Sequence, residues 1–145
     1  MENMQIRRLK IEDAEEITRI YAAITRKPAS ADFKRVVEDH ARREDGACFV
    51  AEMNGQVVGF MISTILTAGF GIPKSAWIAT LGVSPDHMGQ GIGAGLAEEI
   101  FAYYRSHGIE NVYTAVRWDS TDMLSFFKTL GFDRSNFINL RKVLK

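Results

Sequence analysis

The sequence predicts an α/β fold, in which one mixed β-sheet of about six or seven strands carries helices on both faces. The dipeptide Asn54-Gly55 joins two β-rich runs, and it is typical of a tight antiparallel hairpin because both turn positions take positive φ. Further along, residues 76–107 pass from an apolar strand through glycines into an amphipathic helix, as at the start of a parallel βαβ unit. The sheet is therefore expected to be antiparallel in its front half and parallel behind.

A short strand, two helices and the hairpin are predicted for the front half. The strand covers residues 6–9, and helices run from Asp13 to the Pro28 stop and over 30–43, before Gly46. Apolar side chains recur in both helices at the spacing of one helical face, with Ile17, Ile20, Tyr21 and Ile24 in the first and Phe33, Val36 and Val37 in the second. The hairpin strands follow over 48–53 and 56–66.

The back half alternates strands and helices. After a loop over 67–75 that contains Phe70 and Ile72, strands are predicted over 76–83, 111–118 and 136–144. The intervening helices cover 91–107, ended by Gly108, and a segment capped by Asp119 or Ser120 and ended by Gly131. The predicted order is β-α-α-β-β-β-α-β-α-β.

Composition limits the organisation and the partners of the chain. With 145 residues and 46% hydrophobic residues, we expect a single domain over 1–145. Eighteen basic residues balance eighteen acidic ones, which argues against nucleic acid or an anionic membrane as a partner. The single cysteine, Cys48, lies in an apolar run and is interpreted as a buried hydrophobe. No apolar leader or spanning run is visible, so a cytoplasmic location is expected.

The strand-turn-helix segment Val83-Ser84-Pro85-Asp86-His87-Met88-Gly89-Gln90-Gly91-Ile92-Gly93-Ala94 has the pattern of a phosphate-binding turn. Glycines let the backbone approach a ligand, and the first N–H groups of the helix are unpaired. The alternative is a turn whose glycines serve packing only. The spacing Gly89-x-Gly91-x-x-Ala94 also fits a dinucleotide fingerprint, which ranks second because the front of the sheet is antiparallel and only a short tail follows. A Walker loop is excluded, because no Gly-Lys-Ser/Thr follows.

Three segments together resemble the GNAT superfamily of acetyl-CoA-dependent N-acetyltransferases. They are the strand end Leu81-Gly82-Val83-Ser84-Pro85, the loop Met88-Gly89-Gln90-Gly91-Ile92-Gly93 and the later Phe126-Phe127-Lys128-Thr129-Leu130-Gly131-Phe132. The resemblance covers essentially the whole chain. It implies an enzyme that transfers an acetyl group from acetyl-CoA to an amine of a small molecule or a peptide by direct attack in a ternary complex. A non-catalytic module that binds or senses acyl-CoA is the alternative.

The resemblance also implies where acetyl-CoA binds. Strand 76–83 would splay from strand 111–118, and the backbone at Leu81, Gly82 and Val83 would pair with the pantetheine arm. Amides over 88–94 would hold the pyrophosphate, and the full set of implied cofactor-binding residues is Leu81, Gly82, Val83, Met88, Gly89, Gln90, Gly91, Ile92, Gly93, Ala94, Ser120 and Phe127. No metal is expected, since no His, Cys or Asp pair has ligand spacing.

The chain departs from the family pattern at the catalytic positions. Met88 replaces the usual Gln or Arg of the loop, which shifts the phosphate contacts to the backbone, and Phe127 replaces the tyrosine that protonates the thiolate. The strand positions Ala79 and Thr80, where some members carry a basic carboxylate, hold none. Asp119 and Glu52 are the candidates for the general base, with water as the alternative and a structural role as the other interpretation of both.

The acceptor pocket is expected from the first two helices and the loop over 67–75. This region contains Phe70, Ile72 and Trp77 and lacks the acidic cluster that a polycation such as spermidine would need. Apolar residues at the loop tip also suit a contact between subunits, so a homodimer is a further possibility that the sequence leaves open.

Overall fold

The computed structural model describes residues 4–67 and 71–145 of the chain. These residues belong to two compact units, divided between Ala115 and Val116. The first unit contains a mixed sheet flanked by helices, so the predicted α/β fold class is confirmed. The single domain over 1–145 stays a prediction, and the two units are described in turn.

Five strands form the sheet of the first unit, in the spatial order of the chain. The strands are β1 (Met4–Arg8), β2 (Cys48–Met53), β3 (Gln56–Leu66), β4 (Ser75–Val83) and β5 (Val112–Thr114). Strands β1 to β4 pair antiparallel with one another, and β4 pairs parallel with β5, as the hairpin and the glycine turn predicted. Asn54 and Gly55 both have positive φ, at 52° and 79°, which is the backbone that the tight hairpin requires.

The predicted count of six or seven strands is wrong, and so is the final β of the predicted order. The strand expected over 111–118 is shortened to Val112–Thr114, and residues 136–144 form no strand. Ile138 and Leu140, whose side chains are 85% and 87% exposed, lie in an extended tail. An apolar segment forms a strand only when a neighbouring strand satisfies its backbone groups and covers its apolar side chains.

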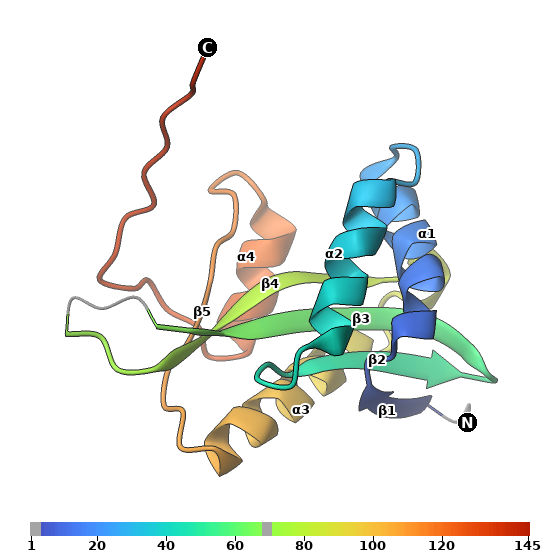
Figure 1. Ribbon diagram of the computed structural model, residues 1–145, viewed down its shortest axis with the longest axis horizontal. Helices are drawn as coiled ribbons and strands as arrows, with labels where there is room; N and C mark the ends of the chain where they lie inside the picture. Colours follow the sequence, from blue (N-terminus) through green and yellow to red (C-terminus); the bar gives the residue numbers. More distant parts are fainter. Residues whose placement is uncertain (1–3, 68–70) are drawn as a thin grey trace. The chain divides into compact units, whose positions relative to one another are not determined.

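Helices cover both faces of the sheet in the first unit. Figure 1 shows α1 and α2 on one face and α3 on the other. Ser30 begins α2 as its N-cap, since its side chain accepts a hydrogen bond from the N–H of Phe33. The elements are the 3-10 turn η1 (Ile11–Asp13), α1 (Ala14–Thr25), α2 (Ala31–Arg42), the 3-10 turn η2 (Pro85–His87) and α3 (Ile92–Ser106).

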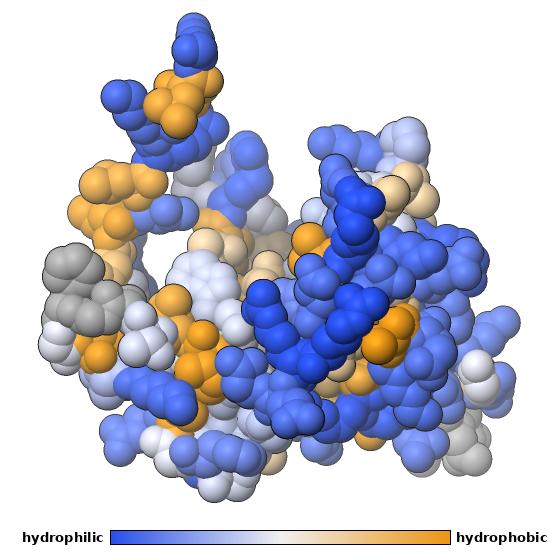
Figure 2. Space-filling model, in the orientation of Figure 1, coloured by the Kyte–Doolittle hydropathy of each residue, from blue (hydrophilic) through white to orange (hydrophobic). Residues whose placement is uncertain are grey.

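Two apolar layers hold these helices on the sheet. On one face, Phe60 and Ile62 of β3 pack with residues of α1 and α2, and both side chains are fully buried. The residues that α3 buries recur at helical spacing, and they are Ile92, Leu96, Ala97, Ile100 and Tyr104. The outer surface of α2 is hydrophilic in Figure 2. The helical periodicity thus predicted the buried positions Ile17, Ile20 and Val37 correctly, whereas Ile24 and Val36, expected on the same faces, are 37% and 46% exposed.

The second unit consists of α4 (Thr121–Thr129) and an extended C-terminal segment. Phe127 is buried, and its ring makes edge contacts with Phe126 and Phe132 at centroid distances of 5.2 and 5.0 Å. Hydrophobic side chains are visible along the exposed C-terminal segment in Figure 2. Within the described ranges of both units, helices long and apolar enough to cross a membrane are absent.

Candidate functional site: the open edge of β4 and the start of α3

Strand β4 keeps β3 as a neighbour beyond Ala79 but loses β5. Its pairing with β3 shifts by one residue between Ile78 and Thr80, which leaves Ala79 as a β-bulge. Its pairing with β5 ends at Ile78, opposite Thr114. In the described part of the first unit, residues 79–83 have β3 on one side and no strand on the other. The bulge and the end of β5 thus open the sheet at the same point.

The register indicates which backbone groups face this opening. The N–H of Ser63 donates to the carbonyl of Ala47, so Ser63 faces the β2 side of β3. Backbone direction alternates along a strand, so Met61 also faces β2, whereas Ile62 and Phe60 face β4. Their partners in β4 are Thr80 and Gly82.

Leu81 lies between these two partners, and Val83 follows Gly82. Both residues therefore point their N–H and C=O groups away from β3, toward the open side. Unpaired strand groups of this kind are a template for an extended ligand, which would add to β4 as another strand does. These are two of the three strand residues that the resemblance implied for the pantetheine arm; that role stays a prediction.

The end of β4 is tied to a second bulge. Val58 is the unpaired extra residue of β3, and its carbonyl accepts a hydrogen bond of 2.8 Å from the N–H of Ser84. The carbonyl of Ser84 in turn accepts one from the N–H of His87. The chain after the open edge is therefore fixed in direction before it reaches the glycines of the turn.

The turn leads to an exposed helix N-terminus. Gly89 and Gly91 have φ values of 81° and 78°, which strongly favour glycine, and Gly91 is the N-cap of α3. The N–H of Gly95 is the first to bond within the helix, to the carbonyl of Gly91. The amides of the first helical turn, over 92–94, therefore have no acceptor in the helix, and no acidic residue lies in that turn. This end of α3 can accept a phosphate.

Close packing brings both flanking helices to the opening. A Cβ placed on Gly59 of β3 would lie 2.9 Å from Cγ2 of Ile92, so the glycine makes room for the start of α3. A Cβ on Gly82 would lie 2.8 Å from Cδ1 of Ile24, so the last turn of α1 lies directly against β4. The open edge is thus bordered by the N-terminus of α3 and the C-terminal end of α1.

The remaining loop residues predicted to bind the cofactor surround this helix end. Met88 is 59% exposed, and Gln90 is also exposed, whereas Ile92 is buried beneath the helix start. Gly93 is half-buried and Ala94 is exposed. The structure therefore brings the predicted residues of 81–94 together along one edge, with mainly backbone groups available to a ligand.

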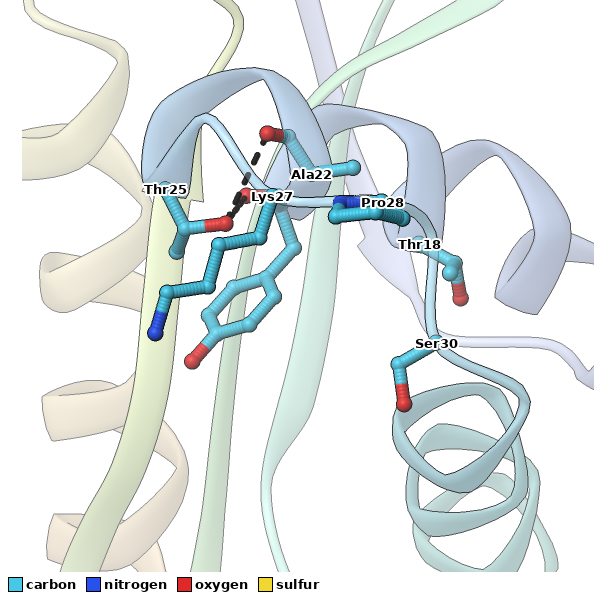
Figure 3. Close-up of a pocket in the computed structure, with 7 residues that line it drawn as sticks. Thr18, Ala22, Thr25, Lys27, Pro28 and Ser30 are labelled. Atoms are coloured by element: carbon cyan, nitrogen blue, oxygen red, sulfur yellow. Dashed lines mark hydrogen bonds between the residues drawn. The ribbon is translucent and has the colours of Figure 1, made fainter.

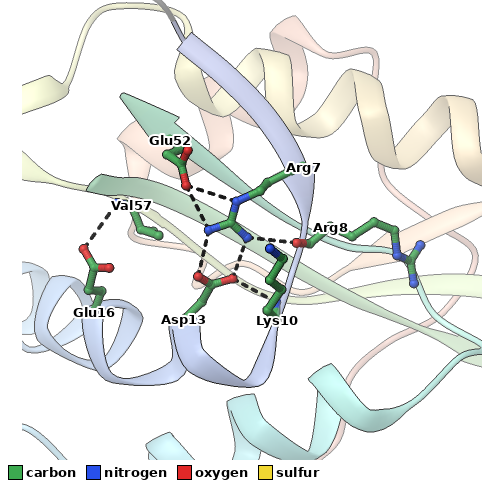
Figure 4. Close-up of polar contacts among 7 residues, drawn as sticks. All are labelled: Arg7, Arg8, Lys10, Asp13, Glu16, Glu52 and Val57. Carbon is green, nitrogen blue, oxygen red and sulfur yellow. Dashed lines mark hydrogen bonds and ion pairs between the residues drawn. The ribbon is translucent and has the colours of Figure 1, made fainter. Parts of the chain in front are cut away.

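Glu52 lies on β2, away from the open edge, in an ion-pair network with Arg7 and Asp13 (Figure 4). Its carboxylate accepts hydrogen-bonding contacts of 3.0–3.1 Å from the guanidinium of Arg7. Arg7 also donates to both oxygens of Asp13, at 2.8 and 2.9 Å, and is held in its charged form by these partners. The strand that carries Glu52, β2, is separated from β4 by β3.

Asp119, Ser120 and Phe127 belong to the second unit. Asp119 is exposed and accepts two hydrogen bonds of 3.0 Å from Arg117, which lower the pKa of its carboxyl. Ser120 occupies the N-cap position of α4, as predicted, but its side chain makes no capping hydrogen bond. Because a lowered pKa weakens a carboxylate as a proton acceptor, the geometry of Asp119 does not favour a catalytic base.

Cys48 is a structural residue, as the sequence predicted. Its side chain is buried, and the thiol donates a hydrogen bond of 3.4 Å to the carbonyl of Ser63. Burial raises the pKa of the Cys48 thiol, so the group stays protonated near neutral pH.

A pocket that no sequence motif identified lies at the C-terminal end of α1 (Figure 3). It has a volume of about 220 Å³ and is lined by residues of α1 and of the turn into α2, among them Tyr21, Thr25 and Lys27. The sequence predicts an acceptor pocket at the first two helices, where this pocket lies, and its role as an acceptor pocket stays a prediction. The other expected contributor, the loop over 67–75, includes Phe70, which lies outside the described residues, whereas Ile72 is half-buried.

Comparison with known proteins relates this arrangement to one family. The sequence model of the Acetyltransferase (GNAT) family matches residues 14–132. A mycothiol acetyltransferase of Renibacterium salmoninarum is 26% identical over 104 residues, which are 72% of this chain and 31% of that protein. The chain thus spans about a third of the length of this curated relative.

Two solved structures share the fold over nearly the whole chain. The aminoglycoside N-acetyltransferase AAC(6')-Iy in complex with CoA superposes with a TM-score of 0.82, at 16% identity, covering 99% of this chain and 96% of that one. An aminoglycoside acetyltransferase from an uncultured soil metagenomic sample, in complex with sisomicin, gives a TM-score of 0.81, at 22% identity, covering 98% and 97%.

Proposed function

The chain belongs to the acetyltransferase (GNAT) family, and from this premise we propose that it transfers the acetyl group of acetyl-CoA to a primary amine of a small molecule or a peptide. One observation carries the proposal. The open edge of β4 at Leu81 and Val83 leads directly to the exposed N-terminus of α3, so an extended thioester arm and its pyrophosphate find complementary groups in succession.

The proposed reaction uses backbone groups to stabilise charge. A backbone N–H of the open edge donates to the thioester carbonyl oxygen, where negative charge develops as the amine nitrogen bonds to the carbonyl carbon. The C–S bond then breaks, the nitrogen loses a proton to a base or to water, and the CoA thiolate takes a proton from solvent. A thiol with a pKa of about 8.5 gives a thiolate that leaves readily. Turnover therefore needs no proton donor at position 127, where this chain has phenylalanine.

The proposal is tested in two stages. Acetyl-CoA is first titrated into the protein by calorimetry, and release of free thiol is then measured across a broad panel of amines and peptides. We expect binding, followed by thiol release with one class of amine. Tight acetyl-CoA binding with no turnover on any amine would instead favour the non-catalytic acyl-CoA-binding module. Binding of NAD with no binding of acetyl-CoA would contradict both.

For the general base, we propose that water accepts the amine proton. Glu52 is paired with Arg7, and Asp119 with Arg117, so neither carboxylate is free. We expect Glu52→Gln and Asp119→Asn each to retain kcat/KM within about threefold, because general-base catalysis contributes about a hundredfold or more when a side chain provides it. The measurement is the pH profile of kcat/KM with the most active amine. A loss of a hundredfold in one variant, together with loss of the acidic limb of its profile, would identify that residue as the base.

A further inference from the structure

The pocket at the C-terminal end of α1 carries one charge. Four of its lining residues, Thr18, Tyr21, Ala22 and Thr25, form one stripe of α1, with Lys27, Pro28 and Ser30 from the turn that follows. Lys27 is the only charged residue among them, and no carboxylate of the described residues forms an ion pair with it. In Figure 3, Thr25 and Lys27 lie at one end of the pocket, and Thr18 and Ser30 at the other.

The hydrogen-bond donors of the lining are available to a ligand. Among the described residues, the Tyr21 hydroxyl has no recorded hydrogen-bond partner, and the Ser30 hydroxyl accepts from Phe33 N–H, which leaves its own proton to donate. The Tyr21 ring is held by stacking on Phe33 at a centroid distance of 4.0 Å. By contrast, Thr25 already donates to the carbonyl of Tyr21, so its oxygen is left as an acceptor.

The net charge of the lining is positive. The C-terminal end of α1 contributes roughly half a negative charge, whereas the Lys27 ammonium contributes a full positive one. The carbonyl of Ala22 in this last turn is already occupied, since it accepts from the N–H groups of Arg26 and Lys27. An anionic group is therefore favoured next to Lys27. One ammonium suits a carboxylate, whereas a phosphate usually has several cations or backbone amides around it.

The last turn of α1 connects the pocket with the proposed acetyl donor site. Ile24, on the same turn of α1 as Thr25, contacts the position where Gly82 lacks a side chain, between Leu81 and Val83 of the open edge. The last turn of α1 thus contributes residues both to the pocket and to the border of the open edge.

We propose that this pocket binds the carboxylate of a small amine acceptor, such as a free amino acid, with the Lys27 ammonium as its counter-ion. The inference rests on the proposed acetyltransferase function and narrows its acceptor class. It also sets this chain apart from the structural neighbours named for aminoglycosides, which are polycations, because a pocket with one cation and no acidic residue repels them.

Matched ligands test the acceptor class. A set of amino acids, each with its primary amide, and the polycation spermidine are titrated into the protein saturated with CoA, which permits binding without turnover. We expect the best carboxylate to bind at least about tenfold tighter than its amide, as a charge-assisted hydrogen bond predicts, and spermidine to bind more weakly than either. Tighter binding of the amide or of spermidine, or no binding of any acid to a protein that binds CoA, would overturn the inference.

Two neighbouring variants localise the effect. Lys27→Gln should remove the preference for the acid and leave acetyl-CoA binding and the melting temperature unchanged. Arg26→Gln removes the same charge from the adjacent residue, which does not line the pocket, and should keep the preference. Equal loss in both variants, or loss of acetyl-CoA binding in Lys27→Gln, would contradict the assignment. Failure of the wild-type protein to bind acetyl-CoA would refute the proposed function separately.

Discussion

Replacing Gly91 with glutamate should abolish acetyl-CoA binding, with a loss of at least about a hundredfold in affinity. Gly91 is exposed at the N-cap of α3, with φ 78°, and a Cβ there meets no atom within 4 Å. The new side chain therefore fits without a clash, at a cost of about 1–2 kcal/mol for the left-handed backbone. Its carboxylate would occupy the position that the pyrophosphate needs and would repel it. Calorimetric titration with acetyl-CoA measures the effect.

The control is the same substitution at the other end of the same helix. Gly108 also has a positive φ, 74°, and open space around its Cβ position, so Gly108→Glu carries the same strain and charge. We expect Gly108→Glu to keep acetyl-CoA affinity within about threefold, since it lies beyond the C-terminus of α3. Circular dichroism would verify that both variants fold. Unchanged affinity in Gly91→Glu would show that this turn does not hold the phosphates.

Replacing Asp13 with asparagine should lower the free energy of unfolding by about 2–3 kcal/mol, or roughly 5–10 °C in Tm. The Asp13 side chain is only 6% exposed and accepts hydrogen bonds from Arg7 and from the N–H of Lys10. Asparagine fills the same space but leaves the Arg7 guanidinium with one carboxylate, Glu52, in place of two. Urea unfolding measures the change.

The matched control for this variant is a carboxylate in an exposed pair. Asp39 pairs with Arg42 on the surface of α2, with its side chain 65% exposed, so Asp39→Asn should cost less than about 0.5 kcal/mol. A cost for Asp13→Asn as small as that for Asp39→Asn would show that the network contributes little to stability.

Lowering the pH should remove the stabilisation by the Asp13 carboxylate in the wild-type protein. Burial acts to raise the pKa of the Asp13 carboxyl, but hydrogen bonds from Arg7 and from the Lys10 N–H outweigh it and lower the pKa below its ordinary value. The unfolded state therefore binds a proton more readily, so the contribution is complete above the unfolded pKa of about 3.9 and is lost as the pH falls through the folded pKa. In the Asp13→Asn variant, unfolding free energy should fall less steeply with acid. Parallel curves for the two proteins would contradict this assignment.

The positions of positive φ and most of the buried helical positions were predictable because local chemistry specifies them. Asn54 and Gly55 take the turn geometry that their residue types favour, and Gly91 begins α3 after the turn. The apolar residues over 136–144 gave a wrong prediction of a last strand. A strand needs a partner strand, and within the described residues this segment has none.

The sequence by itself determined the fold class, the buried role of Cys48, the glycine turn and the family to which the chain belongs. Only the tertiary structure decided that, among the described residues, β4 has a strand on one side only from Ala79 to Val83, that Glu52 is held by Arg7, and that Lys27 lines a pocket at the end of α1 without an ion-pair partner. The physical reason is the range of the interactions. Turn geometry and helical periodicity act between residues close in sequence, whereas strand register and the pairing of Arg7 with Glu52, 45 residues apart, exist only once the chain has folded.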